Sequence, residues 1–236
     1  LGRLSEPEKI FQTIIKNINI TQLFKGKKCL ITAGPTVEPI DPIRYISNYS
    51  SGKQGYEIAK QMALSGAYVT LISGPTNMQP PHNVKLIKVK TAKEMDSASK
   101  KNSKVDIAFF TAAVSDFSPI KFNKTKIKKE NISKIDLKKN MDILKSISSL
   151  KKNRPNLVIG FAAETNNHIL NAKKKLVEKK CDIIVVNKID KKNQVFGSNF
   201  NKVSFIKDNY IKNHKKMTKV NVAKELLKFV KKLELN

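Results

Sequence analysis

The sequence predicts an α/β fold in which a mostly parallel sheet carries helices on both faces. The first observation is that almost wholly apolar runs, at residues 106–114, 157–163 and 182–187, are typical of strands buried on both sides. These runs alternate with amphipathic helical stretches, which favours strand–helix–strand units and parallel pairing. The second observation is a strand at residues 28–33 that is followed by a turn, a long loop and a helix N-terminus. Together they predict a Rossmann-like sheet.

Each remaining element has a local signal of its own. The helix that begins at Gly52 places Tyr56, Ala59 and Met62 on one face at helical spacing, and Gly66 caps its end. Further strands are predicted at residues 67–73, 84–89 and, as an antiparallel edge, 203–207, and further helices at residues 5–24, 91–99, 167–180 and 219–233.

Two segments lack a regular period and are predicted as loops. The loop after the first strand carries Arg44, Asn48 and Lys53, which suit phosphate and carboxylate groups. The second segment, residues 117–139, lies between a buried strand and a helix and carries the basic cluster KIKK at residues 126–129. Long irregular loops inside a compact domain are usually functional or disordered. We interpret this one as a mobile flap over a phosphate-bearing ligand, with a flexible basic surface loop as the alternative.

Candidate site residues gather where the predicted strands end. In open α/β sheets, ligands bind beyond the carboxyl ends of the parallel strands. Each residue alone is a weak signal, since an Asp after a strand is more often a turn or cap residue, but convergence on one edge is stronger. The residues at these ends are Gly34, Ala112, Ala113, Asp116, Gly160, Phe161, Glu164 and Asn187.

The length of 236 residues allows one large domain, or one domain with an extension. We expect a linker with a short helix at residues 1–26 and a single domain at residues 27–236. The chain starts with Leu, so it is expected to be a piece of something longer. No apolar run approaches the ~20 residues of a membrane helix, and no secretory signal is visible. Cys29 and Cys181 lie on predicted strands, and buried reduced thiols fit a cytoplasmic protein.

The net charge of +27 would ordinarily suggest nucleic acid as a partner. The lysines spread along the whole chain and seldom alternate with aromatic residues, so codon drift in an AT-rich genome explains them better, with a real basic patch for phosphate ligands as the alternative. The sequence lacks the dinucleotide fingerprint G-x-G-x-x-G after the first strand, and it lacks a Walker A loop and H-E-x-x-H, C-x-x-C and G-x-S-x-G motifs. No set of metal ligands can be drawn, so magnesium would have to enter with nucleotide phosphates.

Several motifs resemble those of phosphopantothenoylcysteine synthetase, the C-terminal half of a bacterial bifunctional coenzyme A biosynthesis protein. The resemblance covers nearly all of the chain from Lys27 onward. The motifs that carry it are ITAGPT at residues 31–36, RYISN at 44–48, SSGK at 50–53, AAVSDF at 112–117, KIKK at 126–129, GFAAET at 160–165, and the pair Lys175 and Lys179. Residues 2–7 resemble the linker to a flavin-dependent decarboxylase half, which would add FMN if it belongs to the same polypeptide.

The resemblance implies a two-step ligation that depends on CTP and Mg²⁺. The carboxylate of 4'-phosphopantothenate attacks the α-phosphate of CTP and releases pyrophosphate. The amine of cysteine then attacks the acyl-cytidylate and releases CMP. The resemblance also implies a homodimer, with a possible larger assembly through the decarboxylase half. Nucleic acid and membranes are not expected as partners.

The resemblance also implies roles for the matching residues. Asn48 would hydrogen-bond the acyl carbonyl, Arg44 and Ala113 would help bind the pantothenate part, and Lys126 would neutralise charge at the α-phosphate as the flap closes. The nucleotide would be bound by Gly34, Ala112, Ala113, Asp116, Lys126, Met141, Asp142, Ile143, Leu144, Phe161, Lys175 and Lys179.

Within this set, Phe161 would form a wall of the cytidine pocket, and Lys175 and Lys179 would bind the triphosphate. A solvated helix face is the alternative for the two lysines. Two positions depart from the family pattern, since Met141 stands where proline is usual and Lys188 where aspartate is common. An NAD(P)-dependent reductase and a basic nucleic-acid-binding module are the rival classes, and the reductase lacks its glycine fingerprint.

Overall fold

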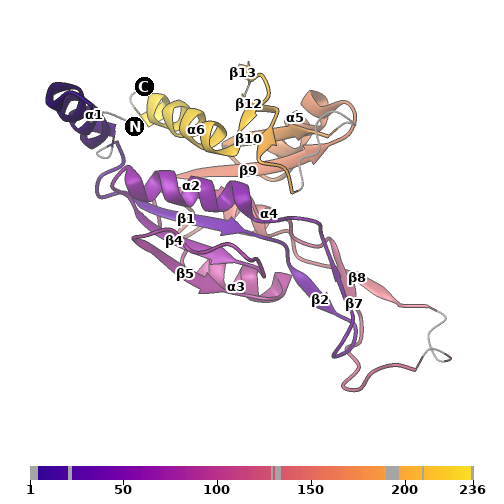
Figure 1. The fold of residues 1–236 in the computed structure, drawn as a ribbon. Helices are drawn as coiled ribbons and strands as arrows, with labels where there is room; N and C mark the ends of the chain where they lie inside the picture. Colours follow the sequence, from indigo (N-terminus) through magenta and orange to yellow (C-terminus); the bar gives the residue numbers. More distant parts are fainter. Residues whose placement is uncertain are drawn as a thin grey trace.

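The fold is built on one eight-stranded sheet (Figure 1). A computed structural model describes residues 5–20, 23–128, 130, 134–189, 197–208 and 210–234. The strands, in spatial order, are β13 (Tyr210–Asn213), β12 (Val203–Lys207), β10 (Ile183–Lys188), β9 (Leu157–Glu164), β6 (Ile107–Phe110), β1 (Lys28–Ala33), β4 (Tyr68–Ser73) and β5 (Val84–Lys88). Neighbours from β10 to β5 pair in parallel, whereas β12 and β13 are antiparallel. The predicted α/β class and the antiparallel strand at one edge are confirmed.

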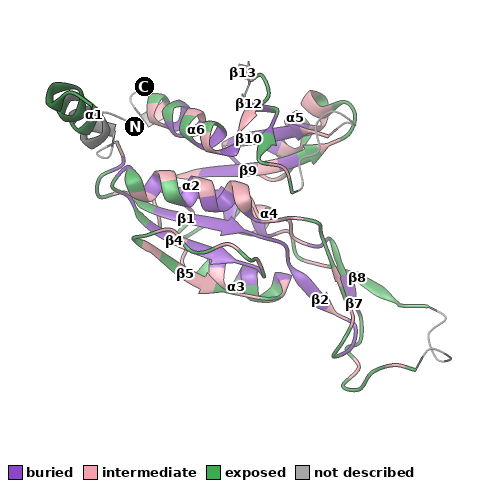
Figure 2. Cartoon of the chain, viewed as in Figure 1, coloured by how far each residue is buried: buried purple, intermediate pink, exposed green. Residues whose placement is uncertain are grey.

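Helices cover both faces of the sheet because its strands are apolar on both sides. Side chains alternate along a strand, so in β1 Cys29 and Ile31 pack under one helix layer while Leu30 packs under the other. The first layer holds α2 (Lys53–Leu64) and α6 (Lys219–Glu234), and the second holds α3 (Ala92–Lys101), α4 (Ile143–Ser148) and α5 (His168–Glu178). The residues of β1 and β10 are almost all buried between these layers (Figure 2).

The local signals read from the sequence hold in these helices. Tyr56, Ala59 and Met62 of α2 are buried, as the helical spacing predicts, and Gly66 adopts a left-handed conformation with φ of 85° just beyond the helix. Cys29 and Cys181 are buried free thiols. Beyond these layers lies α1 (Pro7–Ile20), within the segment predicted as linker and short helix. The first four residues of that segment are outside the described residues.

An arm of two small hairpins replaces the irregular loops that the sequence predicts. One hairpin pairs β2 (Val37–Pro39) with β3 (Tyr45–Ser47), and the other pairs β7 (Phe117–Pro119) with β8 (Leu137–Lys139). Figure 1 shows β2, β7 and β8 projecting away from the central sheet. Strands of three residues are too short to leave a readable period, which is why the sequence does not reveal them.

Short elements complete the described structure. A two-stranded ladder joins β11 (Phe200–Asn201) to β14 (Met217–Thr218), which leads directly into α6. Among the described residues, no helix combines the length and the apolar character needed to cross a bilayer.

Candidate active site

A cleft of about 720 Å³ lies at the carboxyl edge of the parallel strands. This is the edge at which open α/β sheets bind ligands, and the volume falls in the range of small-molecule sites. Its walls come from the loop and first turn of α2, the segment after β6, the start of α4, the middle of β9, and the ends of α5 and β10. The sequence-predicted residues that line it are Asn48, Ala112, Ala113, Asp116, Met141, Asp142, Ile143, Leu144, Phe161, Lys175, Lys179 and Asn187.

Close packing of glycines brings the N-terminus of α2 to the cleft. Gly52, the residue before the helix, has φ of 75°, and a Cβ there would come within 3.3 Å of the Gly34 backbone. A Cβ on Gly55 would lie only 2.6 Å from the Cβ of Ala33. No side chain caps the N-terminus of α2. The backbone N–H groups of its first turn are therefore suited to bind an anion. Gly34 itself packs behind this turn and does not line the cleft.

Asn48, just before this turn in the chain, also lines the cleft. Its Nδ2 donates a hydrogen bond of 3.0 Å to the carbonyl oxygen of Ala113. The backbone N–H of Ala113 donates to the Gly34 carbonyl at 2.9 Å, so the loop after β1 and the loop after β6 are locked together. The Asn48 amide is therefore held at a defined place beside the cleft.

Another wall of the cleft is formed by β9, α4 and α5. Phe161 is half-buried on β9, and Gly160 makes room for Leu144, because a Cβ at residue 160 would lie 2.6 Å from Leu144 Cδ2. Lys175 Nζ pairs with Glu164 Oε1 at 2.7 Å, and Lys179 pairs with Asp142. Asp142 also caps α4 by accepting from the Lys145 N–H at 2.9 Å, so both lysines reach the cleft in partnered, fixed positions.

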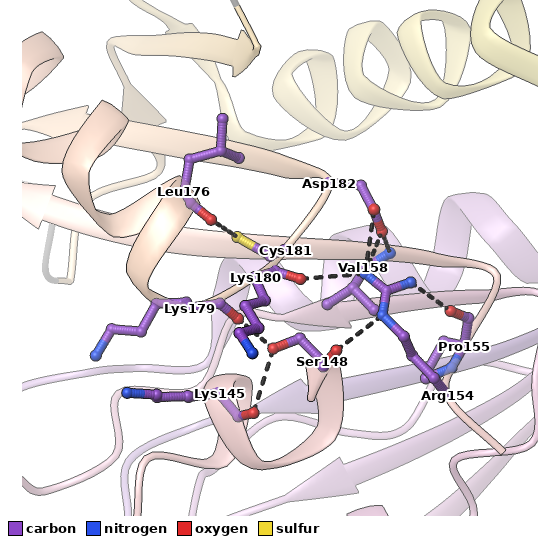
Figure 3. A network of polar contacts seen from close by, with 10 residues as sticks. All are labelled: Lys145, Ser148, Arg154, Pro155, Val158, Leu176, Lys179, Lys180, Cys181 and Asp182. Carbon is purple, nitrogen blue, oxygen red and sulfur yellow. Dashed lines mark hydrogen bonds and ion pairs between the residues drawn. The ribbon is translucent and has the colours of Figure 1, made fainter. Parts of the chain in front are cut away.

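A polar network next to this wall fixes the position of the C-terminal end of α5 (Figure 3). Arg154 donates from Nε to the Ser148 carbonyl at 2.8 Å and from Nη2 to the Lys180 carbonyl and the Asp182 carboxylate. Ser148 Oγ donates to the Lys179 carbonyl. The network thereby ties the C-terminal ends of α4 and α5 together, which fixes the backbone that carries Lys179.

Arg44 and Lys126 lie outside the cleft in this structure. Arg44 forms a two-nitrogen ion pair with the buried Asp41, with Nη2 at 2.5 Å, and the pKa of Asp41 is held well below its usual range, chiefly by this guanidinium. Arg44 Nη2 also donates to the Ile127 carbonyl at 2.7 Å, which joins the two hairpins of the arm. Lys126, next to Ile127, is exposed on that arm. Lys129, the last lysine of the cluster, lies outside the described residues.

The cleft also contains residues that sequence reasoning did not single out, above all Lys219 and Asn201. Burial and, second, the charge of Lys53 lower the pKa of Lys219 to about 8. The sequence carries no signal for this position, because Lys219 is one of 46 basic residues and its burial arises from long-range packing. Of the two departures from the family pattern, Met141 lines the cleft and Lys188 does not.

One acidic side chain of the cleft suits a metal ion that arrives with phosphates. In the described parts of the chain, no three His, Cys, Asp or Glu side chains gather closely enough to hold a metal. Mg²⁺ is commonly bound by one or two carboxylates together with substrate phosphates. Asp116 is an exposed carboxylate at the cleft, whereas Asp142 is already paired. Asp116 therefore fits a magnesium ion carried in by a nucleotide.

The chain is similar to known bifunctional proteins of coenzyme A biosynthesis. The coenzyme A biosynthesis bifunctional protein CoaBC of Borreliella burgdorferi is 44% identical over 235 residues, which are 98% of this chain and 59% of that protein. The protein of the same name from Haemophilus influenzae is 44% identical over 232 residues, which are 96% of this chain and 56% of that protein. The chain thus spans less than two thirds of the length of these relatives.

A solved structure extends the likeness to three dimensions. The crystal structure of the C-terminal domain of a CoaBC protein matches with a TM-score of 0.77 and 38% identity, covering 91% of this chain and 100% of that one. Residues 24–233 match the family described as the DNA/pantothenate metabolism flavoprotein C-terminal domain, which is almost the whole chain. The chain therefore belongs to the family of DNA/pantothenate metabolism flavoprotein C-terminal domains.

Proposed function

We propose that the chain is a phosphopantothenate–cysteine ligase of coenzyme A biosynthesis that uses CTP. It joins 4'-phosphopantothenate to L-cysteine and yields 4'-phosphopantothenoyl-L-cysteine, CMP and pyrophosphate. The observation that carries the proposal is the convergence of Asn48, Ala113, Phe161 and two lysines on one cleft in a chain of this family. The names of its relatives, which act in coenzyme A biosynthesis, support the same reaction.

The cleft walls suggest how the substrates are arranged. The cytosine and sugar lie against Phe161, Leu144 and the first turn of α4, and Lys175 and Lys179 neutralise phosphate charge on this side. The acyl group lies near Asn48 and Ala113. The α-phosphate then sits between these two ends, above the first turn of α2, where backbone N–H groups favour an anion.

In the first step, a carboxylate oxygen of 4'-phosphopantothenate forms a bond to the α-phosphorus, and the bond to the β-phosphate oxygen breaks as pyrophosphate leaves. Chemistry of this kind depends mainly on positioning and on stabilisation of charge. Lys126 enters the cleft as the arm closes and neutralises charge at the α-phosphate. Asp116 would hold a Mg²⁺ ion that arrives with the nucleotide, and that ion would supply further neutralisation of the phosphate charge.

In the second step, the neutral amine of cysteine attacks the acyl carbon of the cytidylate. The amine loses a proton, the carbon–oxygen bond to the phosphate breaks, and CMP leaves. The Asn48 amide donates to the acyl oxygen as it gains negative charge. A donor at this place stabilises the transition state more than the ground state, which is the requirement for catalysis.

One incubation separates this function from its rivals. The chain is mixed with 4'-phosphopantothenate, CTP, Mg²⁺ and cysteine, and the release of pyrophosphate and CMP is followed. Pyrophosphate release that requires phosphopantothenate, with CMP release that requires cysteine, supports the ligase. Failure of both, together with salt-sensitive binding to any duplex, would instead favour a nucleic-acid-binding module.

We also propose that the protein is a cytoplasmic homodimer. Two buried free thiols agree with a reducing compartment. The arm presents large exposed apolar side chains on its two hairpins and the segments beside them, namely Ile43, Tyr45, Phe117, Ile120, Phe122, Ile135 and Leu137. Apolar clusters of this kind mark protein interfaces, and we assign this one to a second copy of the chain.

A further inference from the structure

We propose that Lys219 is a further substrate-binding residue of this cleft, where it contacts the β- and γ-phosphates of the nucleotide and then the departing pyrophosphate. The inference rests on the proposed nucleotide-dependent function. It concerns the wall of the cleft formed by the N-terminal turns of α2 and α6.

Lys219 is built into the cleft wall. It is the first residue of α6 and is only 6% exposed, yet it lines the cleft. A charge at such a buried wall is screened much less by solvent than a charge on the surface. The position therefore differs from that of the many lysines that cover the surface of this chain.

Hydrogen bonds join the N-terminus of α6 to that of α2 at this wall. Gln54 Nε2 donates to the Lys219 carbonyl at 3.1 Å, and Asn201 Nδ2 donates to Gln54 Oε1 at 3.1 Å. Lys53 Nζ is held by Asn199 Oδ1 at 2.8 Å. Two helix N-termini and two lysines thus share one rigid wall, and each helix N-terminus favours negative charge.

Two buried amide oxygens point independently to a ligand. Asn201 is 1% exposed and Asn187 is 7% exposed, and both line the cleft. Within the described ranges, the Oδ1 atom of each has no hydrogen-bond partner. Buried polar atoms are nearly always satisfied, so these oxygens are expected to accept from a bound ligand or from water that surrounds its magnesium ion.

The amount of positive charge indicates which part of the substrates binds here. A single carboxylate needs one cationic partner, whereas the β- and γ-phosphates carry several negative charges. If the cytosine lies against Phe161 and the acyl group near Asn48, the free end of the triphosphate extends toward α2 and α6. Lys219 would then stabilise negative charge that grows on pyrophosphate as it leaves.

Proton uptake by Lys219 on ligand binding distinguishes a phosphate-binding role from a purely structural one. Of the residues on this wall, α2 brings the charged Lys53 and the neutral Gln54, while β10 and β11 bring the neutral Asn187 and Asn201. The pKa of Lys219 is lowered to about 8 by burial and then by Lys53. A polyphosphate would raise that pKa, so binding at about pH 8 should take up roughly half a proton.

The decisive experiment compares Lys219→Met with the wild type by titration calorimetry, using CTP, CMP, pyrophosphate and 4'-phosphopantothenate with Mg²⁺. We expect the dissociation constants for CTP and pyrophosphate to rise about tenfold or more, the scale of a lost hydrogen bond to a charged group. Those for CMP and phosphopantothenate should stay within roughly twofold. Lys219→Arg should restore much of the loss, and Lys224→Met, on the exposed face of α6, should change nothing.

Several results would overturn the proposal. Unchanged binding of CTP and pyrophosphate, an equal loss for CMP, or a loss for phosphopantothenate would each place Lys219 elsewhere. Proton uptake, measured in two buffers of different ionisation enthalpy, must be present in the wild type and absent in Lys219→Met. If the wild type binds pyrophosphate at Lys219 but catalyses no ligation, the proposed function fails while this site stands.

Discussion

At the scale of single residues, the cleft separates binding groups that are already in place from groups that must move. Asn48, Lys175 and Lys179 reach the cleft and have partners there. Lys126 does not reach it, because the arm holds the neighbouring Ile127 against Arg44 and Asp41. The two classes make different predictions for the two chemical steps.

Replacing Asn48 with aspartate should impair the second step. The side chain keeps its shape but loses the donor and gains a charge that repels the developing oxyanion. We expect CMP release to slow about 10²–10³-fold, the usual effect of removing one such donor, while pyrophosphate release is less affected. Rapid-quench measurement of both products tests this, and normal cysteine-dependent turnover would show that the role assigned to Asn48 is wrong.

Replacing Lys126 with glutamine should impair the first step. The change removes the positive charge that the arm brings to the α-phosphate, so pyrophosphate release should slow on the order of a hundredfold. Lys124→Gln, an exposed lysine on the same arm, serves as the control. Equal rates of cytidylyl transfer in the wild type and Lys126→Gln would exclude the closing arm.

The ion pair of Asp41 and Arg44 should make stability depend on pH on the acid side. The folded pKa of Asp41 lies well below its unfolded value, so its contribution is full above about pH 4 and is lost as the pH falls toward the folded pKa. Urea unfolding of Asp41→Asn should therefore show lower stability at pH 7 and a smaller decline between about pH 5 and 2. Asp136→Asn, an exposed carboxylate of the arm, should retain the wild-type decline.

At the scale of elements, the close approach of α2 to the sheet creates the anion-binding end of the cleft. Gly55 lies against Ala33 of β1 and Thr111 beyond β6. The helix can pack this close to the sheet only because Gly55 has no Cβ atom. This contact stabilises the packing of α2 on the sheet, and it also fixes the position of the first turn of α2.

Replacing Gly55 with alanine tests that contact. Alanine favours a helix by about 1 kcal/mol over glycine, but its Cβ would lie 2.6 Å from Ala33 Cβ, which forces the backbones apart. Overpacking costs about 1–3 kcal/mol, so we expect net destabilisation in urea unfolding and weaker CTP binding. Lys60→Ala, on the exposed side of α2, should not destabilise the protein, and a stabilised Gly55→Ala would contradict the packing argument.

At the scale of the whole molecule, the arm lies outside the central sheet and its helix layers, so their packing does not account for its exposed surface. It exposes apolar side chains that a folded monomer leaves in water, and it carries Lys126 and Arg44. A second copy that covers this surface would stabilise the arm near the cleft, so assembly and activity should be linked.

The double substitution Ile120→Lys with Phe122→Lys tests this assembly. Both side chains are exposed on the arm, and two charges should prevent apolar burial against a partner. Sedimentation velocity should show twice the chain mass for the wild type and one chain mass for the variant. Leu170→Lys, exposed on α5, is the control, and a monomeric wild type would refute the proposed dimer.

The sequence alone determined the sheet, its two helix layers and the cleft residues that lie at the strand ends. Those features follow from local signals, because a buried strand is apolar throughout and each parallel strand delivers its last residues to one edge. Only the tertiary structure decided the two hairpins of the arm, the partners of Lys175 and Lys179, the position of Arg44 and Lys126 outside the cleft, and the place of Lys219 in its wall. These features depend on contacts between residues far apart in the chain, and neither period nor composition encodes such contacts.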